Sequence, residues 1–433
     1  MNAAALPTWR WPDDRDDDEL RRRLDGPAGG IDADVARAAD AIIADVAARG
    51  DEALLEATAR FDRVTLTADR IRVDAATIEA SASRIDPALA LSLEQAVTNI
   101  ERFHTAQRRG DTVLDADGLR VELRWSPVAS VALYVPGGRA AYPSSLLMNA
   151  IPALVAGVPR VAVLTVPGTV EQNPAVAWCL RRLGLTEVYR VAGAQAVAAA
   201  AHGTASLPRV DLIVGPGNAY VAAAKRAVFG RVGIDSVAGP SEVVVVADAT
   251  APPEWIAADL LAQAEHDPMA RCLLLTASPD VATAVGDEVA RQLAAATRSD
   301  VAGAALRDWG AIVVVASIDD ARALSNRIAP EHLQLMYAGA DADGWVAGAL
   351  FVGACAPTAL GDYIAGPNHV LPTGGSARFS GPLRVDSFLR ASSVVTPSPA
   401  AAARLAAAAA PIADAEGLSA HASALRARTG GAR

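Results

Sequence analysis

The chain has 433 residues, of which 52% are hydrophobic, and its 39 basic and 49 acidic side chains give a formal net charge of -10. This length is enough for about three domains, and the apolar content is enough for a large core. The acidic balance argues against a nucleic-acid partner, because binding to a phosphate backbone depends largely on clustered Lys and Arg.

The cysteines and the N-terminus indicate the compartment. Cys179, Cys272 and Cys355 are odd in number, far apart and set among apolar neighbours, so they form neither a disulfide framework nor a thiolate zinc site. The opening "MNAAALPTWRWPDDRDDD" lacks the basic start and apolar run of a secretory signal. Apolar stretches such as "LLMNAIPALVAGVPRVAVLTV" are interrupted by Pro and Arg, which predicts helix then strand and no membrane span. We therefore expect a soluble cytoplasmic protein.

The elements begin with helices and change to a strand–helix alternation. Residues from about 30 to 110 have the apolar period of helices, including the long "DPALALSLEQAVTNIERFHTAQRRG". The alternation in "DGLRVELRWSPV" then predicts a β-hairpin. From Val131 onward apolar strands such as "VALYVPGG", "RVAVLTVPG" and "VDLIVGPG" alternate with helices. This order predicts right-handed crossovers and a parallel sheet.

A second α/β unit follows "VAGPSEVVVVAD" and continues through "ARCLLLTA", "AIVVVAS" and "LQLMYA". From about Phe379 the strand signal fades into Ala-rich helices. Two α/β units and a helical tail are therefore the expected architecture.

Two glycine turns follow predicted strands and precede predicted helices: "VPGG" (135–138) and "GPGN" (215–218). Free backbone N–H groups at such a point favour an anion such as a pyrophosphate. Neither turn has the spacing of the dinucleotide fingerprint or of a Walker loop. Tight turns that need glycine for their backbone are the simpler interpretation.

Polar side chains gather at the end of one predicted helix, in "LLAQAEHDP", which Pro268 is expected to terminate. Gln263 and His266 are three residues apart on the same helix face and can reach one ion. Capping of the helix end is the alternative. Glu265 and Asp267 are expected only to orient or cap.

Glu331 and His332, in "APEHLQLM", stand between a predicted helix and a predicted strand. Adjacent side chains point in different directions, so a simple ion pair is not expected. They can present a carboxylate and an imidazole to one pocket, and an imidazole is the usual general base near neutral pH. The alternative is a loop histidine beside a surface glutamate.

Two later segments carry further candidates. "GDYIAGPNHVLPTGG" is a Gly- and Pro-rich loop with Asp362 and His369, and such loops in compact domains are often functional. "DAEGLSAHASALRAR" places Glu416 and His421 in the Ala-rich tail. A solvated loop or helix face explains both segments equally well.

Gln263, His266, Asp362 and His421 together form a set of nitrogen and oxygen ligands without a thiolate. Structural zinc normally uses cysteine, so this set fits a catalytic or substrate-positioning ion. Convergence of the four residues is an expectation that spacing alone does not establish.

Six segments in this order resemble the histidinol dehydrogenase family: "GPGNAYVAAAKR", "IDSVAGPSEVVVVAD", "LLAQAEHDP", "APEHLQL", "GDYIAGPNHVLPTGG" and "AEGLSAH". The resemblance extends from the long helix that ends near Gly110 to His421. It implies an enzyme of histidine biosynthesis that oxidises L-histidinol to L-histidine through a bound aldehyde, with two hydride transfers to NAD.

The resemblance also implies roles for individual residues. Glu331 and His332 resemble the catalytic pair, with His332 as general base and Glu331 activating water, and Gln263, His266, Asp362 and His421 resemble the ligands of one Zn²⁺ per subunit. The implied contacts to the substrate are Ser241, Gln263, His266, His332, Asp362, His369, Glu416 and His421. The implied contacts to NAD are Tyr134, Gln195 and Asn218.

For the architecture, the resemblance implies two incomplete Rossmann-like parallel-sheet domains and a helical C-terminal tail. The expected boundaries are an N-terminal tail at 1–27, a discontinuous zinc-carrying domain at 28–127 and 241–378, an NAD-binding domain at 128–240 and a dimerisation tail at 379–433. Family members are homodimers whose tails cross over, so Glu416 and His421 are expected to act either in their own subunit or in the partner.

Three other functions compete with this one. A relative that oxidises another small alcohol would lose substrate-side groups such as His369 and Glu416, which are present. A silent metal- or nucleotide-binding protein would not need Glu331 and His332 together. A zinc hydrolase would not need the two glycine turns.

Overall fold

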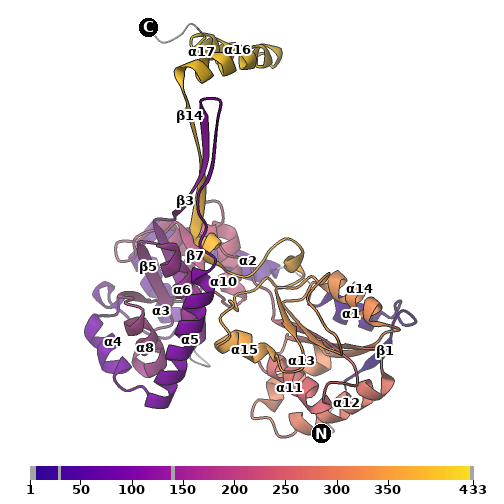
Figure 1. The fold of residues 1–433 in the computed structure, drawn as a ribbon. Coiled ribbons are helices and arrows are strands. Elements are labelled where there is room, and N and C mark those ends of the chain that lie inside the picture. Colours follow the sequence, from indigo (N-terminus) through magenta and orange to yellow (C-terminus); the bar gives the residue numbers. More distant parts are fainter. Residues whose placement is uncertain (1–5, 28–30, 138–141, 430–433) are drawn as a thin grey trace.

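The computed structural model describes residues 6–27, 31–137 and 142–429. Two parallel sheets, each covered by helices on both faces, form two lobes, and an antiparallel arm extends from them (Figure 1). This architecture confirms the expected α/β class with two parallel-sheet units.

The first sheet is parallel throughout and has the strand order β1-β11-β10-β9-β12-β13. Its central strand β9 is buried on both faces, as a strand between two helical layers must be. Helices α11, α12 and α13 cover one face, and α1 and α14 cover the other. The elements are β1 Thr8–Arg10, α1 Asp18–Asp25, β9 Glu242–Ala247, α11 Pro253–Ala264, β10 Arg271–Thr276, α12 Pro279–Leu293, α13 Ser299–Trp309, β11 Ala311–Val314, α14 Ile318–Ile328, β12 His332–Met336, β13 Ala349–Val352 and α15 Thr358–Tyr363.

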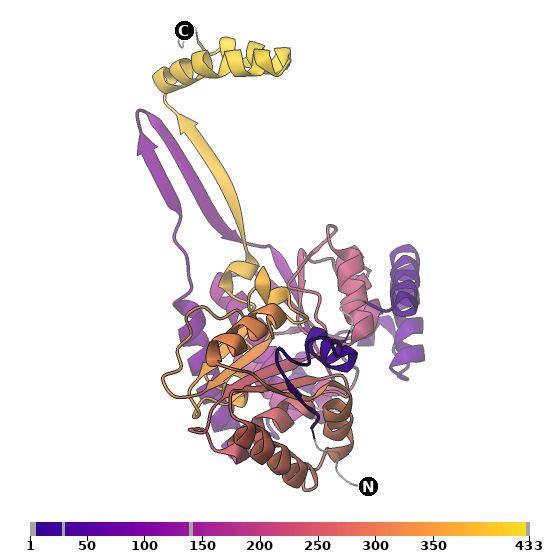
Figure 2. The ribbon, with the colours of Figure 1, turned by 90° about the vertical axis from the view of Figure 1, so that its right-hand side faces the viewer.

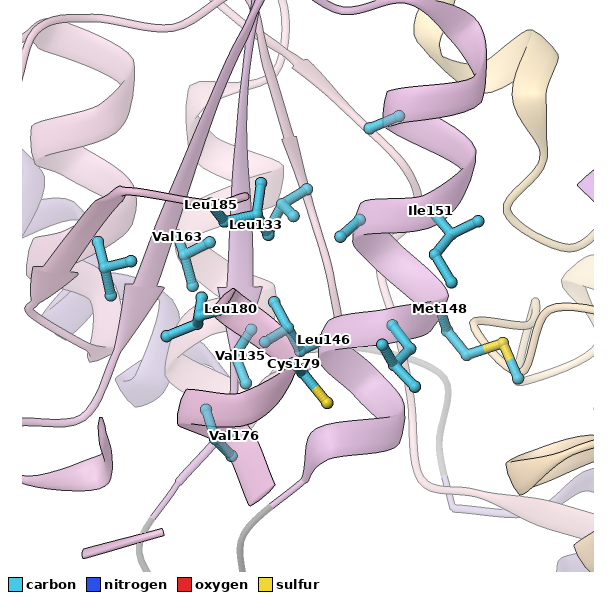
Figure 3. Packing of buried hydrophobic residues seen from close by; sticks show 14 of the residues in the cluster. Leu133, Val135, Leu146, Met148, Ile151, Val163, Val176, Cys179, Leu180 and Leu185 are labelled. Carbon is cyan, nitrogen blue, oxygen red and sulfur yellow. The ribbon is translucent and has the colours of Figure 1, made fainter. Parts of the chain in front are cut away.

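The second sheet is also parallel, in the order β6-β5-β4-β7-β8. Figure 3 shows Leu133 and Val135 of its central strand β4 packed against Leu146 and Leu180 of the covering helices. The elements are α2 Ala33–Arg49, α3 Asp51–Phe61, α4 Ala75–Ala82, α5 Pro87–Thr105, β4 Ser130–Val135, α6 Pro143–Ala156, β5 Arg160–Thr165, α7 Thr169–Gln172, α8 Pro174–Arg182, β6 Glu187–Arg190, α9 Gly193–His202, β7 Leu212–Val214, α10 Ala219–Val228 and β8 Gly233–Ile234.

The packing differs from the predicted domain boundaries in two places. Helices α2 to α5, expected in the same domain as residues 241–378, pack on the second sheet, where Leu54 and Val97 join its two core clusters. The expected N-terminal tail instead supplies strand β1 at the edge of the first sheet and helix α1, whose Leu20 and Leu24 are buried. Periodicity reveals an apolar helix face, but it does not reveal which sheet that face covers.

The arm is a three-stranded antiparallel sheet of β2 (Thr112–Ala116), β3 (Leu119–Pro127) and β14 (Leu389–Pro397). The predicted hairpin is confirmed: Asp117 and Gly118 both have positive φ, 53° and 77°, as a two-residue hairpin turn requires. Strand β14 was not expected, because the arm is largely solvated on both faces and "LRASSVVTP" lacks a one-sided apolar pattern.

Helices α16 (Pro399–Ala415) and α17 (Ser419–Arg426) follow β14 at the far end of the arm. Figure 2 shows that this end of the chain lies well away from both lobes. The helical tail is therefore confirmed, with a strand in front of it. The remaining short helical turns are Ala68–Arg70, Ser376–Arg378 and Val385–Phe388.

No helix in the described part of the chain is both long and apolar enough to cross a membrane. The expected cytoplasmic location stays a prediction. Cys179 and Cys272 are buried and Cys355 is exposed, and the three do not form a disulfide with one another.

Gly215, directly after β7, is at a position where any side chain is expected to destabilise the protein. Its φ is 115°, and a Cβ at this position would lie 2.2 Å from the carbonyl oxygen of Tyr134. Gly184 also has a positive φ, 68°, but a Cβ there meets nothing within 4 Å. Gly184→Ala is expected to lose roughly 1–2 kcal/mol of unfolding free energy from backbone strain alone. Gly215→Ala is expected to lose about 1–3 kcal/mol more because of the clash.

Urea unfolding followed by circular dichroism measures both variants. Equal losses in the two variants would show that the contact with Tyr134 does not matter.

Candidate active site

Gln263 lies in the last turn of α11 and is 3% exposed. The helix ends at Ala264, earlier than the predicted end at Pro268, so His266 lies in the turn that follows. The backbone N–H of His266 donates to the carbonyl of Gln263 at 3.2 Å, which keeps the two residues together. The Asp267 carboxylate accepts from the N–H of Met269 at 2.9 Å and so closes the turn, the capping role expected for it.

Glu331 and His332 are brought to one buried position at the start of β12. Helix α14 ends at Ile328, and the chain turns through Ala329 in the left-handed conformation, φ 49°, before Pro330. The two side chains are 7% and 5% exposed. The interpretation as a loop histidine beside a surface glutamate is therefore wrong.

The backbone of Glu242, at the start of β9, holds both members of this pair. Its N–H donates to Glu331 Oε2 at 2.9 Å, and its carbonyl oxygen lies 3.1 Å from His332 Nδ1. A carbonyl only accepts, so Nδ1 of His332 carries a proton and the neutral ring has its lone pair at Nε2. His332 Nε2 is buried and has no hydrogen-bond partner among the described residues.

Asp362 faces the free side of this imidazole from helix α15. Its Oδ1 lies 3.7 Å from His332 Nε2, and its backbone carbonyl accepts from His369 Nδ1 at 2.8 Å. Glu331 Oε2 lies 3.6 Å from His332 Nδ1 on the other side. Asp362, His369, Glu331 and His332 therefore form one cluster.

Hydrogen bonds hold the segment that carries Asp362 and His369 against the second lobe. Asn99 of α5 donates to the carbonyl of Ile364 at 2.8 Å, and Asn368 donates to the carbonyl of Met148 in α6 at 2.6 Å. Figure 1 shows α15 in the region between the two lobes. The cluster thus depends on contacts from both lobes.

Burial and neighbouring charges shift the pKa of each group in the cluster. Burial raises the pKa of Glu331 to about 7. Burial alone lowers the pKa of His332, but the carboxylates of Glu331 and Asp362 outweigh it and raise that pKa to about 9. Burial raises the pKa of Asp362, but the His332 imidazole 3.7 Å away and the imidazoles of His369 and His266 leave it lowered. Removal from water lowers the pKa of His266 and of His369.

Tyr134, Gln195 and Asn218 line one cavity of ≈ 880 Å³ in the second lobe, within the usual size range of ligand pockets. The hydroxyl of Tyr134 accepts from the N–H of Gly193 at 3.0 Å. The side chain of Asn218 accepts from the N–H groups of Tyr220 and Val221 and so caps α10. The residues expected to contact NAD are therefore adjacent.

Ser241, Glu416 and His421 complete the predicted set. Ser241 directly precedes Glu242, and its carbonyl accepts from the N–H of Arg271 at 3.0 Å. Glu416 and His421 are exposed at the end of the arm, away from the lobes (Figures 1 and 2). Within the described part of one chain, no group of three or more His, Cys, Asp or Glu is arranged to hold a metal ion.

Sequence reasoning missed the buried ion pair between Arg271 and Glu242, each 3% exposed. Both residues stand at the first position of an otherwise apolar strand. Because an unpaired buried charge is costly, the two opposite charges at these positions could have predicted an ion pair. Asp62 also lines the cavity, and no motif around it in the sequence indicated a binding residue.

Two parallel-sheet lobes that jointly hold a buried carboxylate–imidazole pair, with a ligand-sized cavity in one lobe, define an α/β enzyme. Residues 29–429 match the family model described as "Histidinol dehydrogenase". The histidinol dehydrogenase of Rhodopseudomonas palustris is 52% identical over 399 residues, 90% of this chain and 92% of that protein. The histidinol dehydrogenase of Synechococcus sp. is 48% identical over 372 residues, 84% of this chain and 85% of that protein.

A solved structure agrees. The crystal structure of histidinol dehydrogenase from Elizabethkingia anophelis has a TM-score of 0.91 at 31% identity and covers 99% of this chain and 98% of its own. The chain belongs to the histidinol dehydrogenase family, a family of oxidoreductases of histidine biosynthesis.

The buried Arg271–Glu242 ion pair is expected to contribute to the stability of the first lobe. Glu242→Gln leaves the Arg271 guanidinium buried without a counter-charge, which is expected to cost about 3–5 kcal/mol of unfolding free energy. The double variant Glu242→Gln/Arg271→Met removes both charges and is expected to recover part of that loss. Urea unfolding of the three proteins measures this. A double variant no more stable than Glu242→Gln would contradict the account.

Proposed function

We propose that the protein oxidises L-histidinol to L-histidine through a bound aldehyde, with zinc and NAD, and transfers two hydrides in succession. The observation that carries this proposal is the convergence of Glu331, His332, Asp362 and His369 from separate segments onto one cluster. Burial lowers the pKa of His266 and the charge of Asp362 opposes that fall, which supports a position of His266 close to this cluster.

The side chains of the site fit a zinc ion. Gln263, His266 and Asp362 offer oxygen and nitrogen donors. One end of the buried Gln263 amide has no hydrogen-bond partner among the described residues, and a 180° flip of the amide would present its oxygen there. His421 would supply a fourth ligand from the arm of a second subunit. When bound, zinc would hold the amine and imidazole nitrogens of histidinol and weaken the pull of Asp362 on the proton of His332.

The cavity in the second lobe fits a dinucleotide. Tyr134 and Gln195 offer a hydroxyl and an amide there, and Asn218 stands at the amino end of α10, where anions are favoured. Two NAD molecules, bound in succession, would each accept one hydride.

His332 acts as the general base of the first oxidation. Its Nδ1–H is fixed on the carbonyl of Glu242, so in the neutral form of the ring Nε2 takes the proton of the alcohol as the hydride leaves carbon. The buried position excludes water from this proton transfer.

Glu331 serves the second oxidation. Its pKa of about 7 lets the carboxylate accept a proton from the water that adds to the aldehyde, while His332 returns the proton it took from the alcohol to the aldehyde oxygen. The neutral His332 then takes a hydroxyl proton of the hydrate as the second hydride leaves carbon. Ser241 and His369 border the same site and would contact the substrate. Glu416 would do so from the arm.

We also propose a homodimer with exchanged arms. Glu416 and His421 are exposed at the end of an arm that points away from their own lobes. A second copy with the same arm is the natural acceptor, since identical elements exchange readily between protomers.

Purified protein loaded with zinc is expected to reduce two NAD for each L-histidinol consumed, as followed by absorbance of NADH and by product analysis. A chelator is expected to abolish this activity, and added zinc to restore it. Binding of NAD without reduction in the zinc-loaded protein would overturn the proposal.

His332→Asn is expected to keep its zinc and to lose about 10²–10⁴-fold in kcat, because the proton acceptor of the alcohol is removed. Metal content and turnover are measured on the same preparation. His202→Asn, at the end of α9, is the matched control and is expected to retain both. A loss of zinc in His332→Asn equal to its loss of turnover would show that His332 is a ligand.

A further inference from the structure

The cavity of the second lobe contains an acidic residue that no motif marked. Asp62 follows the last residue of α3, and its N–H donates to the carbonyl of Thr58 at 2.9 Å, which fixes its backbone. Its carboxylate accepts from Gln195 Nε2 at 3.2 Å. Gln195 is 2% exposed in the first turn of α9, so the carboxylate is held by a buried amide on the cavity wall.

This carboxylate has unused acceptor capacity. The amide of Gln195 is its one side-chain hydrogen-bond partner in the described parts of the chain, and no Lys or Arg there forms an ion pair with it. A carboxylate accepts about four hydrogen bonds. Burial raises the pKa of Asp62, and the bond from Gln195 offsets part of that rise.

Asp62 also lies close to Tyr134. Burial raises the pKa of the Tyr134 phenol to about 12, and the charge of Asp62 adds to that rise. The carboxylate and the phenol thus act in the same part of the cavity.

The two residues before Asp62 place a guanidinium and an aromatic ring at the cavity. The ring of Phe61 is 49% exposed, and the guanidinium of Arg60 lies 5.0 Å above its centroid. Both residues line the same cavity. An exposed aromatic face binds a nucleobase by stacking. A purine on Phe61 would bring its attached ribose toward the next residue, Asp62.

We propose that Asp62 accepts the vicinal hydroxyls of the adenosine ribose of the dinucleotide and excludes a 2′-phosphate, so that the protein selects NAD over NADP. This inference rests on the proposed function. The two ribose hydroxyls present two donors to the two carboxylate oxygens, a pairing that acidic residues make with NAD in other nucleotide-binding folds. A 2′-phosphate would instead bring about -1.5 to -2 charges against the carboxylate.

Titration calorimetry of NAD and of NADP against the zinc-loaded full-length protein tests this without catalysis. The variants are Asp62→Asn, which keeps the shape and an acceptor for Gln195 but removes the charge, and Asp69→Asn. Asp69 is exposed in the same lobe and does not line the cavity, so it is the matched control for the loss of one charge.

Wild type and Asp69→Asn are expected to bind NAD in clear preference to NADP. In Asp62→Asn the ratio of the two dissociation constants is expected to fall at least about tenfold, mainly through tighter binding of NADP. Arg60 remains beside the site in that variant and can attract the 2′-phosphate.

Equal affinities for the two dinucleotides in the wild type, or an unchanged ratio in Asp62→Asn with NAD still bound, would overturn the role of Asp62 and leave the proposed function standing. A wild type that binds neither dinucleotide, in the presence or absence of L-histidinol, would refute the proposed function and this inference together. Melting temperatures of the three proteins verify that each is folded.

Discussion

The start of strand β9 is the constraint on which the candidate site depends. Glu242 uses its backbone N–H and carbonyl to hold Glu331 and His332, and its side chain forms a buried ion pair with Arg271. The other carboxylate oxygen accepts from the N–H of Gly374 at 2.9 Å. One residue therefore fixes the proposed catalytic pair, the neighbouring strand and the loop that follows His369.

The N-terminal segment is tied to the same point. Arg271 donates to the carbonyl of Leu24, at the end of α1, at 2.5 Å. A helix C-terminus carries partial negative charge, so the guanidinium is stabilised by α1 as well as by Glu242. This contact explains why residues 6–27 belong to the first sheet rather than to a free tail.

The two lobes contribute opposite edges of their sheets. Glu242, Arg271 and His332 begin their strands, so the candidate catalytic cluster lies at the amino edge of the first sheet. The cavity lies at the carboxyl edge of the second sheet, where ligands of open α/β folds usually bind. The segment around Asn368 crosses from one lobe to the other and thereby positions Asp362.

The sequence predicted much of this arrangement, because strand–helix alternation and the polar positions of Glu331 and His332 are local features. Features that depend on contacts between residues far apart in the sequence were not predictable. Which sheet α2 to α5 cover depends on tertiary packing. Strand β14 has no one-sided apolar pattern. Helix α11 ends at Ala264, so His266 lies outside the helix in which the sequence placed it. Asp62 was not singled out, because the role proposed for it depends on a contact with Gln195, 133 residues away.

A mixed dimer tests most directly whether the arm of one subunit completes the site of the other. Subunits that carry His332→Asn and subunits that carry His421→Ala, with different tags, are co-expressed and the mixed dimer is isolated. Arm exchange combines both changes in one site and leaves the other site intact, so the mixed dimer is predicted to have about half of the wild-type activity while each parent is inactive. A mixed dimer as inactive as its parents would contradict a site completed by the partner's arm.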